Sequence, residues 1–351
     1  MNPTPSLAEL RATPAGSLEA LLGQSDLDRT VATISGNRIT GLFRGDERRA
    51  LVQLLCEERV DELSPAMRAR VVHALRRLAP NPVISTGIRE MLVSLTGAGF
   101  RDMKYLLNAT GDRHDLEHVV FERLTEADRH AVLAHIAREA EDAPSHDLRI
   151  LCDIDDTVKA MLHDNRYPRG KVYPGVIELL IALDAGRSAE PSRPGDLTFV
   201  TARPEGPKGL IEQYTRNGLS GLGLPPHSVL GGSFLNLFTK ASIKERKLQN
   251  FDRERALFPE CRFMFLGDSG QADAQVGAEM LRRGPDFVVA VLIHEVVPVT
   301  GDARDQLEAA GIRFHSSYDE AARIVHRLGL IDTTARDLVF KAVDAESGAM
   351  T

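Results

Sequence analysis

The chain has 351 residues, of which 43% are hydrophobic and 26% are charged, and its formal net charge is -7. This length predicts two domains, because compact domains cluster near about 100 to 200 residues. The acidic balance argues against a nucleic-acid-binding protein, which would carry a basic surplus or stripe. An anionic substrate must therefore meet a locally positive site.

The three cysteines and the first residues of the chain indicate where in the cell the protein is expected. Cys56, Cys152 and Cys261 are far apart, and two of them lie in apolar, strand-like runs where a thiol behaves as a small hydrophobe. The first residues show no basic start followed by an apolar run, and no later stretch is apolar for long enough to span a bilayer. We expect a cytoplasmic protein that could act at a membrane surface as a peripheral protein.

The first part of the chain predicts helices only. Residues 1–30 are rich in Pro, Ser, Ala and Gly, which predicts a flexible arm. Residues 31–143 repeat apolar positions at helical spacing and predict an all-α domain. Leu63 to Arg68 resembles Leu124 to Arg129, and each segment offers a Ser or Thr N-cap. We interpret this as a duplicated unit, with coincidence as the alternative, and expect the domain to bind an unknown protein partner.

From residue 146 to 331 short apolar runs alternate with helical stretches. This alternation predicts an α/β domain, with a parallel sheet and helices on both of its faces. In such sheets reactive groups gather at the carboxyl ends of the strands. Residues 332–351 predict a C-terminal helical tail. The expected strands are 148–153, 197–201, 228–230, 262–268, 287–294 and 312–315, and the expected helices are 175–185, 206–217, 240–257, 271–283, 302–310 and 317–329.

Two carboxylates follow the first expected strand at alternate positions, Asp153 and Asp155. Two acids brought together at a buried position favour a hard divalent ion such as Mg²⁺, which also bridges to phosphate. One carboxylate can then attack phosphorus while the other handles protons. The pattern is weak alone, since Asp155, Asp156 and Thr157 could simply form a helix-capping turn.

Other strand ends supply matching groups. Thr201 and Arg203 follow the second strand and offer a hydroxyl and a guanidinium to phosphate oxygens. Asp268 ends the fourth strand and would complete a metal shell. Three lysines lie between Arg203 and Asp268 in the sequence and could supply positive charge to the transferring phosphoryl group. They are Lys240, Lys244 and Lys247.

In this order the motifs resemble those of the haloacid-dehalogenase superfamily. They are Asp153-x-Asp155-x-Thr157, strand-terminal Thr201, a lysine and Gly267-Asp268-x-x-x-x-Asp273. Within that superfamily, residues 146–330 resemble the catalytic domain of the actin-patch phosphatidate phosphatase family. The finer resemblance rests on Asp153-Ile154-Asp155-Asp156-Thr157, Tyr173-Pro174-Gly175-Val176, Phe258-Pro259 and Gly267-Asp268-Ser269-Gly270-Gln271.

The resemblance implies a role for each matching position. Asp153 would be the nucleophile and a metal ligand, and Asp155 the general acid/base, which also holds Mg²⁺ through its backbone carbonyl. Thr201 would bind phosphate and Asp268 would bind the metal, whereas Asp273 would be an outer metal contact or the partner of the lysine. Lys247 fits the family spacing before Phe258, with Lys244 one helical turn earlier as the alternative.

Substrate contacts are expected from Thr157, Arg203 and Arg169. The segment Thr201-Ala202-Arg203-Pro204 departs from the Ser-Asn-Ser-Pro type of yeast-like members, which weakens the assignment of the substrate but not that of the fold. The insertions after Asp153 and after Thr201 are short and predict a minimal cap, which leaves room for a lipid headgroup or a phosphoprotein. A basic flap in the first insertion offers contacts to phosphate or anionic lipid and consists of His163, Arg166, Arg169 and Lys171.

The resemblance implies hydrolysis of phosphatidate to diacylglycerol through an aspartyl-phosphate. The alternatives are a phosphatase for a phosphoprotein or a soluble phosphomonoester, and a non-catalytic scaffold with a helical binding module. A further alternative is zinc chemistry, since His114 to His118 matches the His-x-x-Glu-His pattern of inverted zinc proteases, although no third ligand is evident.

Overall fold

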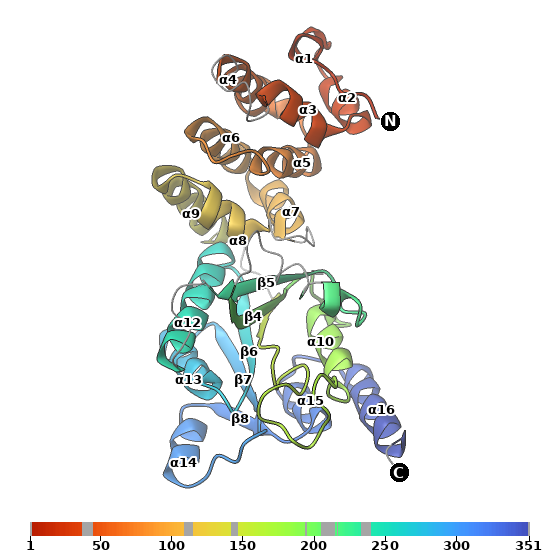
Figure 1. Ribbon diagram of the computed structural model, residues 1–351, viewed down its shortest axis with the longest axis vertical. Helices are drawn as coiled ribbons and strands as arrows, with labels where there is room; N and C mark the ends of the chain where they lie inside the picture. The colour runs from red at the N-terminus through yellow and green to blue at the C-terminus, as the bar shows by residue number, and fades with distance from the viewer. Residues whose placement is uncertain are drawn as a thin grey trace. The chain divides into compact units, whose positions relative to one another are not determined.

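The computed structural model describes residues 2–36, 45–108, 115–141, 147–193, 195–204, 215, 217–232 and 240–349. The chain divides into two compact units, one of residues 1–110 and 114–143 and the other of residues 111–113 and 144–351. The main division falls in the polar segment where the sequence pattern changes from purely helical to alternating. The first unit is helical, and the second is an α/β unit (Figure 1).

The helical unit is a stack in which α3 packs on α5, α5 on α7, α4 on α6, and α6 on α9 (Figure 1). Buried side chains at helical spacing, such as Val71, Val72 and Leu75, hold these layers together. Its elements are α1 (Leu7–Ala12), α2 (Leu18–Gln24), α3 (Leu27–Ser35), α4 (Gly45–Gln53), η1 (Leu54–Glu58), η2 (Val60–Glu62), α5 (Pro65–Arg76), α6 (Pro82–Val93), α7 (Gly97–Asn108), α8 (Leu116–His118), η3 (Val119–Arg123) and α9 (Glu126–Glu141).

The segment expected to be a flexible arm differs from that expectation. It forms helices α1 and α2 and the start of α3, with the side chains of Leu10, Leu18 and Leu22 fully buried. Ser6 and Glu9 form a capping box that starts α1, and α2 and α3 pack on α5. These helices are too short to show a long apolar period, so their burial against the rest of the unit was not visible in the sequence.

The two similar sequence segments adopt similar local structure. Each follows a π-helical turn, η1 or η3, and each starts its next helix with a side-chain cap. Ser64 Oγ accepts the amide of Met67 at 3.2 Å, and Thr125 Oγ1 accepts the amide of Asp128 at 3.3 Å. The predicted N-caps therefore both form.

The α/β unit is built on a six-stranded parallel sheet in the order β5-β4-β1-β6-β7-β8. All six expected strands are present, which confirms the predicted fold class. β1 lies in the centre between β4 and β6, so every residue of this strand is buried. The strands are β1 (Leu148–Cys152), β4 (Leu197–Pro204), β5 (His227–Gly232), β6 (Arg262–Asp268), β7 (Val288–His294) and β8 (Ile312–His315), and a separate hairpin, not predicted, pairs β2 (Gly186–Arg187) with β3 (Glu190–Pro191).

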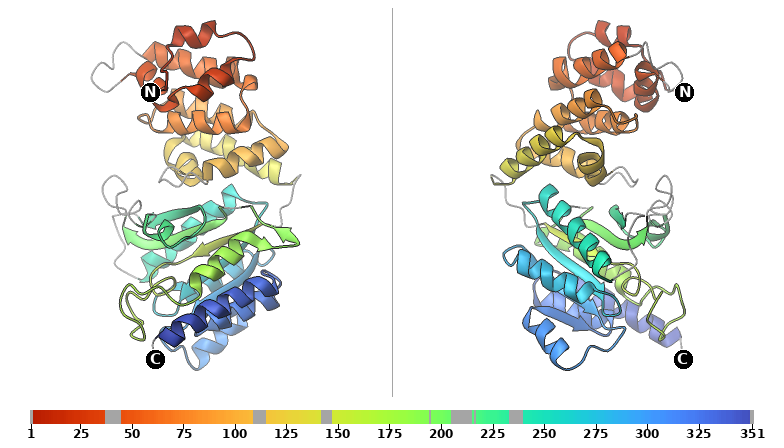
Figure 2. Two further views of the ribbon diagram at one scale, coloured as in Figure 1. Left: turned by 90° about the vertical axis from the view of Figure 1, so that its right-hand side faces the viewer. Right: turned by 60° about the vertical axis from the view of Figure 1, so that its left-hand side comes forward.

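Helices cover both faces of this sheet, as Figures 1 and 2 show. α12 and α13 lie on one face, and α10 and α15 lie on the other. The expected C-terminal tail is α16, which packs on α10 and α15 and buries Val339. The helices are α10 (Val176–Ala185), α12 (Lys240–Leu257), α13 (Asp273–Arg283), α14 (Asp302–Ala309), α15 (Tyr318–Arg327) and α16 (Thr333–Ala349), whereas the helix expected at 206–217 falls mostly outside the described residues.

A buried ionic cluster lies at the amino end of β1 and was not predicted. The Arg149 guanidinium donates to Glu254 at 2.9 Å, to Asp196 at 3.1 Å and to the Thr198 hydroxyl at 3.1 Å. It also lies 3.6 Å from the centre of the Phe258 ring, within the range of a cation–π contact. This cluster ties β1, β4 and α12 together.

None of the described helices is both long enough and apolar enough to cross a membrane.

Candidate active site

The carboxyl end of the sheet brings together three buried carboxylates and one lysine. Asp153 directly follows β1, Asp268 ends β6, and Asp273 begins α13, while Lys247 comes from α12. Lys247 Nζ lies 2.8 Å from Asp153 Oδ1 and 2.5 Å from Asp273 Oδ1. All four side chains are buried. Residues far apart in the sequence thus form one charged cluster, as expected from parallel strands.

The structure distinguishes the two candidate lysines. Lys247 is buried and bridges Asp153 and Asp273, whereas Lys244, one turn earlier on α12, is only half-buried. Burial alone would lower the pKa of Lys247, but the carboxylates of Asp153 and Asp273 raise it above its usual value. The lysine therefore stays charged. Of the two roles expected for Asp273, the structure shows the contact with the lysine.

The turn after β6 fixes Asp268 through its own backbone. Asp268 Oδ1 accepts the amides of Gly270 at 2.6 Å and Gln271 at 3.1 Å. Gly267 is required beside it, because a Cβ there would lie 2.6 Å from Asp273. The Gly-Asp-Ser-Gly-Gln sequence therefore allows Asp273 to pack closely against the end of the strand.

The electrostatics of this cluster oppose the ionisation of its carboxyl groups together. Burial raises the pKa of Asp153 to about 7, with Asp273 and Asp155 adding to the shift and Lys247 opposing it. Burial and the neighbouring Asp273 and Asp153 raise the pKa of Asp268 to about 9. Lys247 alone therefore does not compensate the carboxylates around it.

The same cluster fits a hard divalent cation. Oxygen atoms of Asp153, Asp268 and Asp273 lie within 4.8 Å of one another. Asp153 Oδ2 is buried and has no hydrogen-bond partner among the described residues. An all-oxygen set with one open carboxylate oxygen and excess negative charge suits Mg²⁺. The same residues were expected from the sequence to hold a metal.

Asp155 and Thr157 lie on the turn that leaves β1. Asp155 is half-buried, so it remains within reach of solvent or of a leaving group. Thr157 is buried, and its Oγ1 has no partner among the described residues. Its backbone carbonyl accepts the Tyr318 hydroxyl, which anchors the turn to α15.

Asp156, for which no catalytic role was predicted, organises the first insertion. It has a positive φ of 61°, which is unusual for a residue other than glycine. Its carboxylate accepts the amides of Met161 at 2.7 Å, Leu162 at 3.0 Å and His163 at 2.7 Å. Burial works against its charged form, but these hydrogen bonds outweigh burial and lower the pKa of Asp156. The sign of this role in the sequence was that Asp156 is the second of two consecutive aspartates in the motif.

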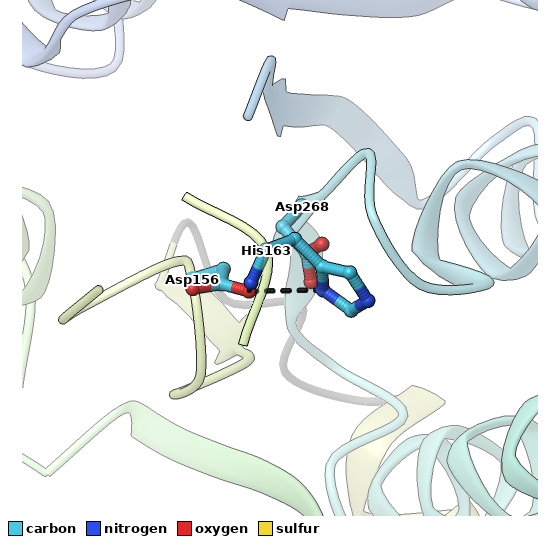
Figure 3. Close-up of side chains that lie close together, drawn as sticks. All are labelled: Asp156, His163 and Asp268. Atoms are coloured by element: carbon cyan, nitrogen blue, oxygen red, sulfur yellow. Dashed lines mark hydrogen bonds and ion pairs between the residues drawn. The ribbon is translucent and has the colours of Figure 1, made fainter. Parts of the chain in front are cut away.

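A second group of metal-ligand types lies beside the first, namely Asp156, His163 and Asp268 (Figure 3). His163 Nδ1 lies 3.0 Å from Asp156 Oδ2. The Asp156 carboxylate is thus already occupied by three amides and a ring nitrogen. We interpret this group as a hydrogen-bonded support for the insertion rather than as a metal centre.

The residues of the expected basic flap are mostly paired. His163 contacts Asp156, Arg166 pairs with Asp164 at 2.8 Å, and Lys171 pairs with Glu346 at 2.6 Å. Arg169 is exposed. The pairing of Arg166 and Lys171 connects the flap to its own loop and to α16.

Several expected positions fall outside what the structure describes. Thr201 and Arg203 lie on β4, which borders β1, but their side chains are not among the described ones. His114, half of the zinc pattern, is also outside the described residues. In the part that is described, Asp115 starts α8 as its N-cap by accepting the backbone amide of His118 at 3.2 Å.

Part of the chain matches a known protein family. Residues 148–295 match the family model described as phosphatidate phosphatase APP1, catalytic domain. The matched segment runs from β1 to the end of β7 and therefore contains all four members of the charged cluster. No curated protein and no solved structure matches the chain.

Proposed function

Because residues 148–295 belong to the family of phosphatidate phosphatase APP1 catalytic domains, we propose that this phosphatase removes phosphate from phosphatidate with Mg²⁺ and through Asp153. The open oxygen of Asp153 carries this proposal. It is a buried carboxylate oxygen without a partner in the described structure, beside a lysine that holds the other oxygen of the same group. A carboxylate fixed in this way is oriented for attack on phosphorus.

Asp153 and Asp268 would hold the metal, with Asp273 as an outer contact and the backbone carbonyl of Asp155 as a further ligand. Bound Mg²⁺ would neutralise the carboxylates and the phosphoryl oxygens, so that the two anions can approach each other. Lys247 holds Asp153 in position and adds positive charge on the side opposite to its open oxygen.

The proposed reaction has two steps. In the first, Asp153 forms a bond to phosphorus while the bond from phosphorus to the diacylglycerol oxygen breaks, and Asp155 gives that oxygen a proton. In the second, Asp155 takes a proton from water, which attacks phosphorus and releases orthophosphate from Asp153. The partial exposure of Asp155 supports this role, because it must exchange protons with both the lipid alcohol and water.

The second candidate substrate is a soluble phosphomonoester or a phosphoprotein. The buried nucleophile would serve these substrates equally well, so the family match alone favours the lipid. We expect orthophosphate release from vesicles containing phosphatidate in Mg²⁺, and loss of release in excess EDTA with recovery on adding Mg²⁺. Release from soluble phosphomonoesters alone would support the proposed reaction mechanism and contradict phosphatidate as the substrate. No release from lipid, soluble or phosphoprotein substrates would contradict the proposal and favour a scaffold.

A further inference from the structure

Two loops at the carboxyl end of the sheet expose apolar side chains beside the catalytic cluster. Leu162, in the insertion after β1, is 56% exposed, and Val297, in the loop after β7, is 38% exposed. Pro298 next to Val297 is exposed as well. Single exposed hydrophobic residues are ordinary in proteins, so their exposure alone carries no conclusion.

What sets these two loops apart is how their backbones are held. Asp156, next to Asp155, accepts the amide of Leu162 at 3.0 Å. Ser269, next to Asp268, accepts the amide of Val297 at 2.9 Å and donates to its carbonyl at 2.7 Å. Each apolar loop is therefore fixed by the residue that directly follows a catalytic or metal-binding carboxylate.

Both loops contact the turn that follows Asp268. A Cβ on Gly270 would lie 2.7 Å from the ring of His163, so the turn after Asp268 packs directly against the residue after Leu162. Figure 3 shows Asp156, His163 and Asp268 side by side at this point. Leu162, Val297 and Pro298 therefore belong to two loops that both contact the turn after Asp268, and we name these three residues the apolar rim.

The charge of the surrounding insertion is opposite to that of the whole chain. Residues 158–175 contain one acidic side chain, Asp164, and four basic ones, whereas the chain has a net charge of -7. Arg169 is exposed, and Lys171 is exposed although paired with Glu346. The basic residues are Lys159, Arg166, Arg169 and Lys171. Basic and apolar side chains together match an anionic bilayer, where charge attracts the protein and apolar side chains insert.

We propose that the apolar rim inserts into an anionic lipid bilayer and brings the active site onto the membrane. This inference rests on the proposed function for its biological meaning, but vesicle binding can be measured without any reaction. A protein partner would require a complementary surface, whereas a bilayer needs only exposed apolar side chains among basic ones.

The experiment compares two double variants of the full chain. Leu162→Ser with Val297→Ser removes the rim, and Leu338→Ser with Ile181→Ser is the matched control, with exposures of 54% and 40% on α16 and α10. Binding is measured by co-sedimentation with phosphatidylcholine vesicles with and without phosphatidylserine. Hydrolysis of phosphatidate in vesicles is compared with hydrolysis of a short-chain phosphatidate below its micelle concentration.

We expect the wild type and the control variant to bind the anionic vesicles. For the rim variant the vesicle dissociation constant and the ratio of short-chain to vesicle activity should both rise about tenfold, because two apolar side chains no longer insert. Equal vesicle binding by the rim and control variants, or no binding by the wild type, would overturn the docking inference even if phosphatidate is hydrolysed. Rim-dependent vesicle binding without phosphatidate hydrolysis would support docking and contradict the proposed function instead.

Discussion

The two ends of strand β1 carry two buried ionic clusters with reversed charges. At the amino end the strand contributes a cation, Arg149, and α12 contributes an acid, Glu254. At the carboxyl end the strand is followed by an acid, Asp153, and α12 contributes a cation, Lys247. Arg149 and Asp153 are four residues apart, and Lys247 and Glu254 are seven apart, or about two helical turns. One strand and one helix thus build both clusters.

The clusters differ in how far the group contributed by the strand or by the residue that follows it is hydrogen-bonded. All three nitrogen atoms of the Arg149 guanidinium donate hydrogen bonds, and a phenyl ring covers it. Asp153 instead keeps one oxygen without a partner in the described structure, and its pKa is raised to about 7. In the amino-end cluster, Asp196 Oδ2 is also buried without a partner in the described structure, and burial raises the pKa of Asp196. The two clusters therefore differ in the group that the strand or the residue after it contributes, which is fully hydrogen-bonded in Arg149 and open in Asp153. An open, perturbed carboxylate at the carboxyl end of a parallel sheet is typical of a reactive site.

The largest expected effect is on Asp153. Asp153→Asn removes the nucleophilic charge, so orthophosphate release should fall by at least about 10³-fold while the far-UV circular dichroism spectrum is retained. The matched control is Asp305→Asn, since Asp305 is exposed on α14. A residual rate above about a tenth of the wild-type rate would show that Asp153 is not the nucleophile.

The next largest effect should separate the two lysines. Lys247→Met removes the ammonium group that contacts Asp153 and Asp273, so the rate should fall about 10²-fold. Lys244→Met, on the same helix, should stay within about threefold of the wild type. Steady-state rates at saturating Mg²⁺ measure both variants. The reverse order of effects would mean that the lysine contacts described here are not those of the working enzyme.

A substitution of Arg149 tests whether the cluster at the amino end of β1 contributes to stability rather than to catalysis. Arg149→Met leaves Glu254 and Asp196 buried without their cation, which should lower the free energy of unfolding by about 3 to 5 kcal/mol. Urea unfolding followed by circular dichroism measures this loss. At temperatures where the variant is folded, its kcat should remain within a few-fold of the wild type. A stable variant with little activity would contradict the division of roles between the two clusters.

The smallest effect concerns Asp184, whose carboxylate accepts the amides of Gly195 and Asp196 beside the amino-end cluster. Burial raises its pKa to about 6. A carboxyl whose pKa rises on folding contributes stability below its unfolded pKa, and this contribution is lost as the pH rises through about 6. Asp184→Asn should therefore match the wild type near pH 4 and be more stable at pH 7.5, by on the order of 2 kcal/mol.

Urea unfolding at both pH values tests this prediction, with Asp305→Asn as the exposed control. A difference between the wild type and Asp184→Asn that is independent of pH would mean that Asp184 titrates normally in the folded protein.

Strand and helix positions in the α/β unit were predictable, because buried parallel strands and their covering helices leave distinct apolar periods. The meeting of Asp153, Asp268 and Asp273 was predictable too, since each follows or ends a strand or begins a helix at one edge of a parallel sheet. The motif did not decide between Lys244 and Lys247. That choice depends on which face of α12 points to Asp153, and the structure supplies it.

The sequence missed features that depend on tertiary contacts. Arg149 lies in an apolar run and its partners are 47 and 105 residues away along the chain, so no local pattern indicates them. Asp156 stands within the motif but no role was predicted for it, and its carboxylate accepts the amides of residues five to seven positions later. The basic flap was interpreted by composition alone, and its acidic partners Asp164 and Glu346 became apparent only from the fold.

Trapping the phosphoryl group on the enzyme is the most direct test of the central claim. Wild-type enzyme with Mg²⁺ and phosphatidate labelled with ³²P would be quenched in acid within one turnover, digested and mapped by mass spectrometry. We expect the label on the peptide that contains Asp153, released by hydroxylamine as an acyl phosphate should be, and absent from Asp153→Asn. Turnover without any label on the protein, or label on another residue, would contradict nucleophilic attack by Asp153.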